Sequence, residues 1–313
     1  MLFRSPEFME RALNIPKEIG ERIRASWGAD ELSLYGRFDF ILAKDGTPKI
    51  LEFNADTPTS LLEASVIQWQ WKEDVFPECD QFNGIHEGLV QSWKDIFPKK
   101  GEIHFAGALE NNEDTGTLQY LASTAMEAGF STRVLDMQAL DLQNGRFFDP
   151  AGELVNRCFK LYPWEWMVDE SPDGCLAEME WLEPIWKLVM SNKAILATLY
   201  ELFPDSPYVL PCYLSRPRSG LFCKKPVFSR EGHNVSVVDI RDWEEYVRIA
   251  ETEGDYNTGA YVYQEYVEPT AYSGRYPVIG SWIIGGEAAG IGIRENRMEV
   301  TDNLSEFVPH IIG

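Results

Sequence analysis

The sequence is poor in cysteine, in basic residues and in long apolar runs. Its five cysteines are odd in number and form no CxxC pair, which argues against a disulfide framework or a zinc site and favours buried reduced thiols. Lys and Arg number 28 against 50 Asp and Glu, a net charge of −22, so nucleic acid is disfavoured as a partner because phosphate binding needs a basic surface. No apolar run approaches the ~20 residues of a membrane span. The first 20 residues carry charges throughout, unlike a secretory signal, and we expect a cytoplasmic protein without a membrane partner.

The rest of the composition is that of an ordinary globular protein. Hydrophobic residues make up 44% and charged residues 25% of the 313 positions, enough for one large domain or two to three smaller lobes. The acidic balance would attract cations such as metal ions or polyamines. Taken alone, however, it indicates only solubility.

Periodicity predicts a mixed α+β architecture. Helical spacing appears in residues 1–30, with a break at Pro16, in residues 59–76, and again in residues 182–203. Residues 101–136 read as strand, helix and strand, a βαβ unit of an open sheet that follows a candidate boundary near residues 97–101. Beyond Pro211 five short alternating segments predict strands, and Gly285-Gly286 predicts a tight hairpin turn between the last two.

The segment YGRFDFILAKDGTPKILEFN, residues 35–54, is the most informative in the chain. With Asp45-Gly46 as the two central residues of a tight turn, paired positions sum to 91. Asp39 then lies opposite Glu52 and Arg37 opposite Asn54, with all four side chains on one face. The other face carries apolar side chains that we expect to pack into the core, namely Phe38, Phe40, Leu51 and Phe53.

Two interpretations of this polar face remain open. Carboxylates directly opposite each other on a ladder repel, so a cation is expected between Asp39 and Glu52. A magnesium ion held by these carboxylates and the Asn54 amide oxygen satisfies this, and the Arg37 fork suits a phosphate or carboxylate. Alternatively, the face is solvated and Arg37 simply neutralises the acids.

Candidate phosphate ligands occur later in the chain, each with a simpler alternative. Lys193 lies on an otherwise apolar predicted helix, where a lysine that extends its amine to solvent is the ordinary case. Lys224 and Lys225 lie on a predicted strand, before a turn at Gly232 whose backbone amides could approach a phosphate. Neither GxxxxGK[ST] nor GxGxxG is present. The strand from Gln264 to Pro269 could meet a nucleotide base or be an ordinary half-buried strand.

Together these motifs resemble a known family. YGRFDF, LEFNADTPTSLLEA, WKLVMSNKAIL, KKPVFSREGHNV, YQEYVEP and GSWIIGGEAAGIGIRE are similar to the synthetase domain of glutathionylspermidine synthases and their amidase-less relatives, in the same order. The resemblance extends from about Tyr35 to the C-terminus. It implies an α+β or α/β chain with a permuted ATP-grasp fold and an inserted Rossmann-like pre-ATP-grasp module. Residues 1–98 would form the first ATP-grasp part with the metal hairpin, 99–182 the inserted module, and 183–313 the remainder with the nucleotide lysines.

The resemblance also implies roles for individual residues. The metal ligands for two Mg²⁺ ions that bridge the ATP phosphates would be Asp39, Glu52 and Asn54. Lys193, Lys225 and the Gly232 loop would hold the phosphates, and the adenine pocket would be lined by Gln264, Glu265, Tyr266 and Val267. Arg37 and Arg294 would flank the transferring phosphoryl group. The substrate-binding residues would be Asp56, Thr57, Thr59 and Glu110.

The implied activity is ATP-dependent ligation of a carboxylic acid to an amine through an acyl phosphate. The acid would be a glutathione-like peptide and the amine polyamine-like. The chain has no room for the cysteine-dependent amidase of the bifunctional members, and residues 1–34 are short for the family, so we expect an amidase-less relative. A nucleotide-binding protein without turnover and an ATP-grasp phosphotransferase remain alternatives.

Overall fold

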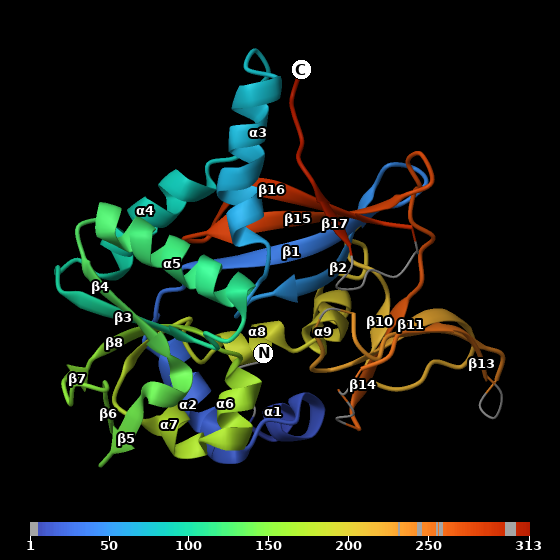
Figure 1. Cartoon of the computed structure of the whole chain (residues 1–313). Helices are drawn as coiled ribbons and strands as arrows, with labels where there is room; N and C mark the ends of the chain where they lie inside the picture. Colours follow the sequence, from blue (N-terminus) through green and yellow to red (C-terminus); the bar gives the residue numbers. More distant parts are fainter. Residues whose placement is uncertain (1–5, 231, 243–245, 255, 257–258, 298–304) are drawn as a thin grey trace.

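The computed structural model describes residues 6–230, 232–242, 246–254, 256, 259–297 and 305–313. In these ranges the chain forms four β-sheets, with helices at the ends of the molecule and between the sheets (Figure 1). The mixed α and β content agrees with the predicted class. No helix among the described residues is long and apolar enough to span a bilayer.

The first sheet is antiparallel throughout and contains the predicted hairpin at one edge. Its strands, in spatial order, are β17 (Glu306–Val308), β16 (Glu287–Asn296), β15 (Tyr276–Ile284), β1 (Tyr35–Leu42) and β2 (Pro48–Asn54). Gly285 and Gly286 join β15 to β16 with φ values of 58° and 91°, as the two-residue turn requires. Helix α4 (Ile85–Ile96) contacts β15. The predicted helix at 59–76 forms η2 (Glu63–Ile67) and α3 (Gln68–Val75), and α3 extends away from the sheet (Figure 1).

The hairpin has the predicted pairing at its open end but a different turn. Arg37 pairs with Asn54 and Asp39 with Glu52, which confirms the predicted register there. The loop is one residue longer than predicted, because Ala43 N–H donates to the Thr47 carbonyl at 3.0 Å and Gly46 adopts φ 80°. A three-residue loop that ends in left-handed glycine is a common alternative to the two-residue turn. A bulge between Asp39 and Phe40 absorbs the extra residue. On the turn side of the bulge Phe40 pairs with Ile50, and on the open side Asp39 pairs with Glu52 as predicted.

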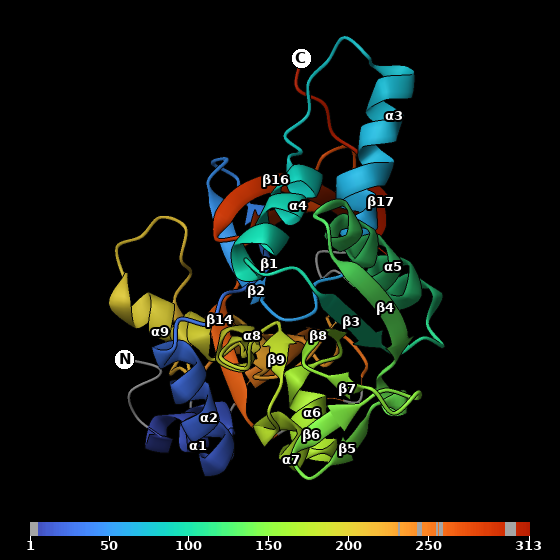
Figure 2. The same cartoon turned by 90° about the vertical axis from the view of Figure 1, so that its left-hand side faces the viewer.

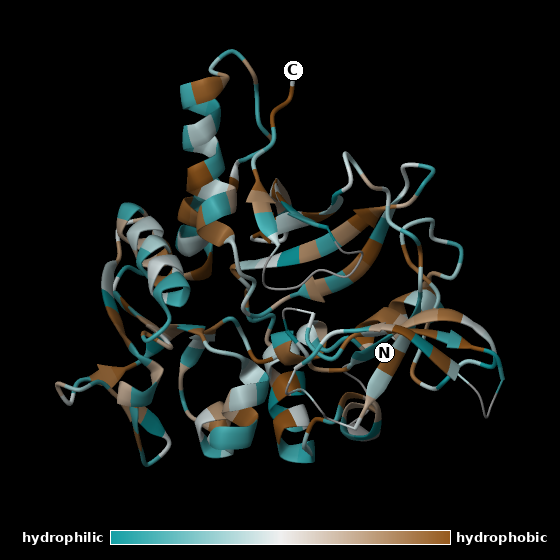
Figure 3. Cartoon of the chain, turned by 45° about the vertical axis from the view of Figure 1, so that its right-hand side comes forward, coloured by the Kyte–Doolittle hydropathy of each residue, from teal (hydrophilic) through white to brown (hydrophobic). Residues whose placement is uncertain are grey.

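The expected orientation of the two hairpin faces is wrong. The polar side chains of Arg37 and Asp39 are buried, whereas Phe38, Phe40 and Phe53 are only half-buried and Phe38 stacks on Phe53. Hydrophilic and hydrophobic segments alternate along the strands of the first sheet (Figure 3). The charged face is covered because the second sheet and the segment around Lys193 pack over it. Alternation correctly grouped the side chains by face, but did not indicate which face other parts of the chain would cover.

The second sheet carries the second predicted lysine motif. It is antiparallel, and its strands in spatial order are β10 (Cys212–Tyr213), β14 (Tyr261–Glu265), β11 (Gly220–Pro226), β12 (Ser236–Ile240) and β13 (Tyr246–Glu251). The predicted strands near residues 222–228, 232–238 and 259–267 are therefore confirmed within the described part of the chain. This sheet lies beneath the first one at the end near the β1–β2 loop (Figure 1).

A parallel sheet contains the predicted βαβ unit. β3 (Glu102–Gly107), α5 (Asn112–Glu127) and β4 (Ser131–Asp136) follow one another, and β3 also pairs in parallel with β8 (Arg157–Leu161), which pairs with β9 (Glu180–Leu182). Between β4 and β8 the chain forms the turn η3 (Met137–Ala139) and a small antiparallel sheet of β5 (Asp141–Gln143), β6 (Arg146–Phe148) and β7 (Leu154–Val155).

Four helices lie next to the parallel sheet. They are α1 (Pro6–Leu13), α2 (Lys17–Gly28), α6 (Trp164–Glu170) and α7 (Pro172–Leu176), which lie together in two perpendicular views (Figures 1 and 2). The predicted helical start with a break at Pro16 is confirmed for its described residues. All five cysteines are free, three of them buried and Cys79 and Cys223 half-buried.

The single helix predicted for residues 182–203 is wrong. The segment begins in β9, then forms α8 (Lys187–Ser191) and α9 (Ile195–Leu202) with a break between them. Asn192 stabilises the break: its side chain accepts a hydrogen bond from Ala194 N–H at 2.9 Å and donates to the Leu13 carbonyl at 2.9 Å. Lys193 therefore lies in a junction, where its own N–H donates to the Val227 carbonyl at 2.8 Å.

Two large hydrophobic clusters run through the fold. One joins α1 and α2 to β8, α6, α8 and α9, and the other joins the first sheet to α4, α5 and the parallel sheet. Each cluster contains residues from all three predicted segments. The division at residues 98 and 182 stays a prediction.

Candidate active site

The Asp39 carboxylate is the centre of a buried charge cluster on the first sheet. Arg37 Nε lies 2.6 Å from Oδ1, and Arg37 Nη2 and Arg294 Nη2 lie 3.0 and 2.7 Å from Oδ2. Arg294 comes from β16, and its side chain is 19% exposed. Burial disfavours the charge on Arg37, but the nearby anionic groups, chiefly Asp39 and then Glu52, together outweigh it and raise the pKa of Arg37. Arg37 also donates to the Thr59 carbonyl, which fixes the loop after β2 to the same cluster.

Gly280 makes room for this arrangement. It pairs with Asp39 on the neighbouring strand β15, and a Cβ atom there would lie 2.6 Å from Arg37 Cδ. The glycine therefore leaves space for the Arg37 side chain to reach Asp39 across the sheet.

Glu52 is the second carboxylate, and it faces lysines instead of arginines. Lys193 Nζ lies 3.0 Å from its Oε2, and Asn54 Nδ2 lies 3.4 Å from its Oε1 and 3.1 Å from Asp39 Oδ2. Burial raises the pKa of Glu52, but Lys193 and Lys225 outweigh it and lower the pKa to about 2. Asn54 therefore lies between two carboxylates, and Glu52 is ionised at neutral pH.

The two lysines are buried and come from different parts of the fold. Lys193, 8% exposed, also donates to the Ser229 carbonyl at 2.6 Å. Lys225, 6% exposed, is on β11 and donates to Gln264 Oε1 at 2.7 Å and to the Leu51 carbonyl at 3.1 Å. The alternative of a surface location for Lys193 is wrong, because the break between α8 and α9 turns its amine into the interior.

Four of these groups, Asp39, Glu52, Lys193 and Lys225, line one cavity between the first and second sheets, here called the first cavity. Gly232 and the segment Gln264–Val267 also lie at its wall. The other lining residues are Ile41, Leu51, Leu210, Cys223, Val235, Pro269 and Val278. Every residue predicted to bind the nucleotide thus lies at one cavity. Leu51, assigned above to the opposite face, lies at this wall because the bulge after Asp39 shifts the strand.

A smaller polar cavity, here called the second cavity, adjoins the first at Lys193. It is lined by Phe53, Asn54, Ala55, Asp56, Thr57, Glu165, Ser191, Lys193, Phe228, Ser229 and Arg230. Arg230 follows β11 in the loop that leads to Gly232. Its Nε and Nη2 lie 3.0 and 2.7 Å from Glu165 Oε1, and its Nη1 donates to Thr57 Oγ1.

Two of the four predicted substrate-binding residues, Asp56 and Thr57, line the second cavity, and Thr59 and Glu110 do not. Thr57 lies at the second cavity, and Thr59 contributes its carbonyl to Arg37. The Asp56 carboxylate is 1% exposed and both its oxygens are already bonded, to Lys160 Nζ at 2.7 Å and Trp164 N–H at 2.8 Å. Glu110 is exposed in the turn before α5 and does not line either cavity.

Three functional candidates escaped the sequence analysis: Arg230, Glu165 and Lys160. Arg230 stands two residues before Gly232 in a motif already noted, so proximity to that glycine was an available signal. Glu165 and Lys160 occur in a tryptophan-rich connection and on a strand of the βαβ region, where no local pattern marks them.

The donor atoms at the hairpin suit a hard divalent cation. Asp39 and Glu52 are carboxylates on neighbouring strands, and the side-chain amide of Asn54 lies within hydrogen-bonding distance of both. Oxygen ligands of this kind are those that Mg²⁺ prefers. The four surrounding cationic side chains, Arg37, Lys193, Lys225 and Arg294, are the groups that phosphate oxygens would pair with.

Acid pH should expose the contribution of Glu52 to stability. Its pKa is about 2 in the folded chain against an ordinary 4.5, so the stabilisation is complete above about pH 4.5 and is lost as pH falls through about 2. Glu52→Gln should therefore lower the Tm of the metal-free protein more at pH 6 than at pH 3. Thermal denaturation in EDTA measures this, with exposed Glu178→Gln as the control. An equal loss of Tm at both pH values would contradict the assignment.

Comparison with known proteins places this fold among the glutathione synthetase-like proteins. A solved glutathione synthetase-like effector of Globodera pallida superposes with a TM-score of 0.57 at 11% identity and covers 99% of this chain and 83% of its own. At that identity the likeness concerns the fold alone. A fold shared with a glutathione synthetase-like protein is therefore the first level of assignment.

The family assignment follows from the sequence match. Residues 4–313 match the family described as "Glutathionylspermidine synthase preATP-grasp", and the chain belongs to that family. A Haemophilus influenzae protein named "Putative acid--amine ligase" is 39% identical over 303 residues, which are 92% of this chain and 77% of that protein. The trypanothione synthetase of Crithidia fasciculata is 28% identical over 331 residues, 95% of this chain and 50% of that protein. The chain thus spans about half the length of the synthetase.

Proposed function

We propose that this protein is an ATP-dependent carboxylate–amine ligase that forms an amide bond through an acyl phosphate. The observation that carries the proposal is the first cavity, which brings the buried Lys193 and Lys225 together with the carboxylates of Asp39 and Glu52. Arg37 and Arg294 lie beside it, bonded to Asp39. Its family membership and the named relatives, an acid–amine ligase and a trypanothione synthetase, support this reaction class.

In this proposal the chain has a permuted ATP-grasp fold. The hairpin with Asp39 and Glu52 precedes Lys193 and Lys225 in the sequence, whereas the reverse order is the usual one in the superfamily. The parallel sheet of β4, β3, β8 and β9 would be the inserted Rossmann-like module. Its βαβ unit supports that assignment.

The nucleotide would occupy the first cavity between the two antiparallel sheets. Gln264–Val267 and the apolar wall would hold adenine, while Lys193, Lys225 and the backbone at Gly232 would hold the phosphates. Asp39, Glu52 and Asn54 would hold Mg²⁺, which would neutralise charge on the phosphate oxygens. Arg37 and Arg294 would then stabilise the charge that develops on the transferring phosphoryl group.

The acid substrate would place its carboxylate in the second cavity. Lys193 is shared by both cavities, so a carboxylate there would lie next to the terminal phosphate. Arg230 and the Thr57 hydroxyl provide the cation and the polar group that a carboxylate needs. The roles of Thr59 and Glu110 in substrate binding stay predictions.

The reaction has two balanced steps. A carboxylate oxygen attacks the γ-phosphorus, the bond to the β–γ bridging oxygen breaks, and ADP leaves. An unprotonated amine then attacks the acyl carbon, inorganic phosphate departs with the C–O bonding electrons, and the amide nitrogen loses a proton. Little covalent participation by the protein is required, since positioning and charge stabilisation do most of the work.

A glutathione-like acid and a polyamine-like amine are the proposed substrate classes. They follow from the names of the relatives, among them a bifunctional glutathionylspermidine synthetase/amidase of Escherichia coli. The net charge of −22 is compatible with a polycationic amine. We expect the protein to work in the cytoplasm.

The test is to incubate the protein with Mg-ATP, glutathione and spermidine, and with wider panels of acids and amines, and to follow ADP release and product mass. Release that requires both an acid and an amine, with a product of the combined mass less water, supports the ligase. Hydroxylamine in place of the amine should trap the acyl phosphate as a hydroxamate. ADP release with one substrate and a stable phosphorylated product would instead indicate a phosphotransferase. Nucleotide binding without turnover across the panels would indicate a binding protein.

A further inference from the structure

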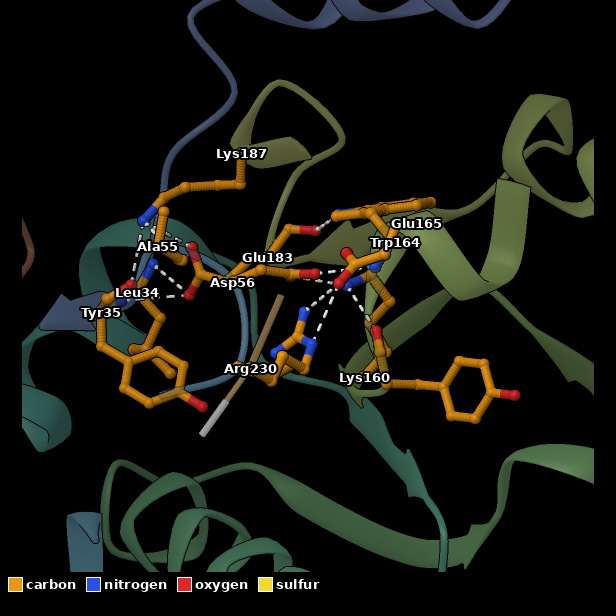
Figure 4. Close-up of polar contacts among 12 residues, drawn as sticks. Leu34, Tyr35, Ala55, Asp56, Lys160, Trp164, Glu165, Glu183, Lys187 and Arg230 are labelled. Atoms are coloured by element: carbon orange, nitrogen blue, oxygen red, sulfur yellow. Dashed lines mark hydrogen bonds and ion pairs between the residues drawn. The ribbon is translucent and has the colours of Figure 1, made fainter. Parts of the chain in front are cut away.

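A cluster of buried charged side chains lies at the wall of the second cavity. Its central pair is Asp56, in the loop after β2, and Lys160, on β8 of the parallel sheet. Both are fully buried, at 1% and 0% exposed, and their charged atoms lie 2.7 Å apart. Figure 4 shows them converging from segments that are far apart in the sequence.

Every charged group of this pair already has partners. Lys160 Nζ donates also to the Tyr162 carbonyl at 2.9 Å and lies 4.3 Å from the centre of the Trp164 ring. The second oxygen of Asp56 accepts from Trp164 N–H at 2.8 Å. Both Asp56 oxygens are thus bonded within the fold, although Asp56 also lines the second cavity, and its contact with a substrate stays a prediction.

The pair is instead joined at both ends to residues that line the second cavity. Thr57 follows Asp56 directly in the chain, so fixing the Asp56 carboxylate fixes the backbone that carries the Thr57 hydroxyl. Glu165 follows Trp164 in the same way, and it holds Arg230 at 2.7 and 3.0 Å. Arg230 in turn donates to Thr57 Oγ1, so the two cavity residues are also bonded to each other.

We propose that Asp56 and Lys160 are positioning residues that aim Thr57 and Arg230 into the second cavity. This rests on the proposed function for the use of that cavity, and it assigns neither residue a contact with substrate. The geometry favours it over a purely structural pair because Asp56 is joined to cavity residues in two ways. Thr57 is its neighbour in the chain, and its bond from Trp164 N–H fixes the residue before Glu165. The cluster is buried, so its bonds are stronger than exposed ones and hold one arrangement.

The position of the hairpin itself is fixed by a different pair. Glu183 Oε1 accepts from Leu34 N–H and Tyr35 N–H, both at 3.0 Å, and Lys187 Nζ donates to the carbonyls of Tyr35 and Ala55 at 2.9 and 3.0 Å. These bonds hold the open end of the hairpin without involving Asp56. Loosening Asp56 and Lys160 should therefore disturb the second cavity and leave the first one in place.

The test uses a double variant because a lone change leaves a charge unpaired in a buried site. Asp56→Asn/Lys160→Met keeps an acceptor for Trp164 N–H and removes both charges together. We expect the KM for glutathione to rise at least tenfold while the KM for Mg-ATP changes less than twofold. Leu121→Ala, a fully buried position on α5 outside both cavities, is the control for a general loss of stability. A glutathione KM that rises no more than in that control, or an equal rise in the Mg-ATP KM, would overturn the proposal.

A second measurement does not depend on the substrate. In the ligand-free double variant, amide hydrogen exchange should accelerate in the peptides that contain Thr57 and Arg230, and remain at the wild-type rate in β1. Unchanged exchange in those two peptides, or acceleration throughout the chain as in Leu121→Ala, would overturn the positioning role. If the wild-type protein does not turn over glutathione, that result counts against the proposed substrate class alone. The exchange measurement still tests the positioning role, because it is made without substrate.

Discussion

Replacing Asp39 by Asn is expected to lower kcat by on the order of 10³-fold while the chain remains folded. Asp39 receives charged hydrogen bonds from Arg37 and Arg294 and lies on the strand opposite Glu52. As a proposed metal ligand it supports the charge stabilisation of phosphoryl transfer, a contribution of several kcal/mol. Each 1.4 kcal/mol of lost stabilisation is a tenfold loss of rate, so about 4 kcal/mol gives the expected drop.

The same substitution should also reduce stability, since a buried arginine then faces a neutral amide. Removing one partner of a buried ion pair costs about 3–5 kcal/mol. The substituted amide retains an oxygen for one arginine, which keeps the loss toward the lower end. Circular dichroism and thermal denaturation check the fold, ADP release measures kcat, and a magnesium titration tests for weaker metal binding. Asp141→Asn, the same change at an exposed site on β5, serves as the control. A folded Asp39→Asn variant with kcat within tenfold of wild type would remove Asp39 from the metal site.

The spacing of residues within single segments predicted most of the site. Arg37, Asp39, Glu52 and Asn54 share a face because alternate residues of a strand do, and this relation survived an error in the turn. The loop has three residues instead of two, and the bulge after Asp39 absorbs the difference. Leu51, the residue that the bulge leaves unpaired between Glu52 and Ile50, lies at the first cavity instead of on the predicted face. Local periodicity was sufficient where the strand is regular and failed where an extra residue entered.

What the sequence could not predict are contacts between distant segments. Lys160 and Asp56 are 104 residues apart and meet only because β8 runs beneath the loop after β2. Lys193 was expected on the surface of a long helix in one interpretation, and its burial depends on Asn192, whose side chain bonds both to the chain just after it and to Leu13. Which face of a hairpin is buried is likewise a property of what packs over it. Such information is tertiary, and a single sequence carries no local signal for it.

Lys225 gives the second large expected effect. Lys224, its neighbour on β11, serves as the control because the two side chains point to opposite sides of the strand. Lys225 lies at the first cavity and is bonded to Gln264 and to the Leu51 carbonyl. Lys224 Nζ lies 3.8 Å from the centre of the Tyr261 ring and does not line that cavity. Alternation along one strand therefore provides a test residue and its control with the same chemistry.

Lys225→Met should weaken Mg-ATP binding roughly 10- to 100-fold, since a hydrogen bond to a charged group contributes about 1.5–3 kcal/mol. Lys224→Met should leave the Kd within about twofold, because the loss of one cation–π contact at a partly exposed site is worth only about 0.5–1 kcal/mol to the fold and nothing to the ligand. Isothermal titration calorimetry with a non-hydrolysable ATP analogue measures both. Lys225 also helps to hold the pKa of Glu52 at about 2, so the Lys225→Met protein should in addition lose part of its stability at neutral pH. Equal Kd values for the two variants would mean that the nucleotide phosphates do not lie in the first cavity. A larger effect from Lys224 would place them on the opposite face of the second sheet.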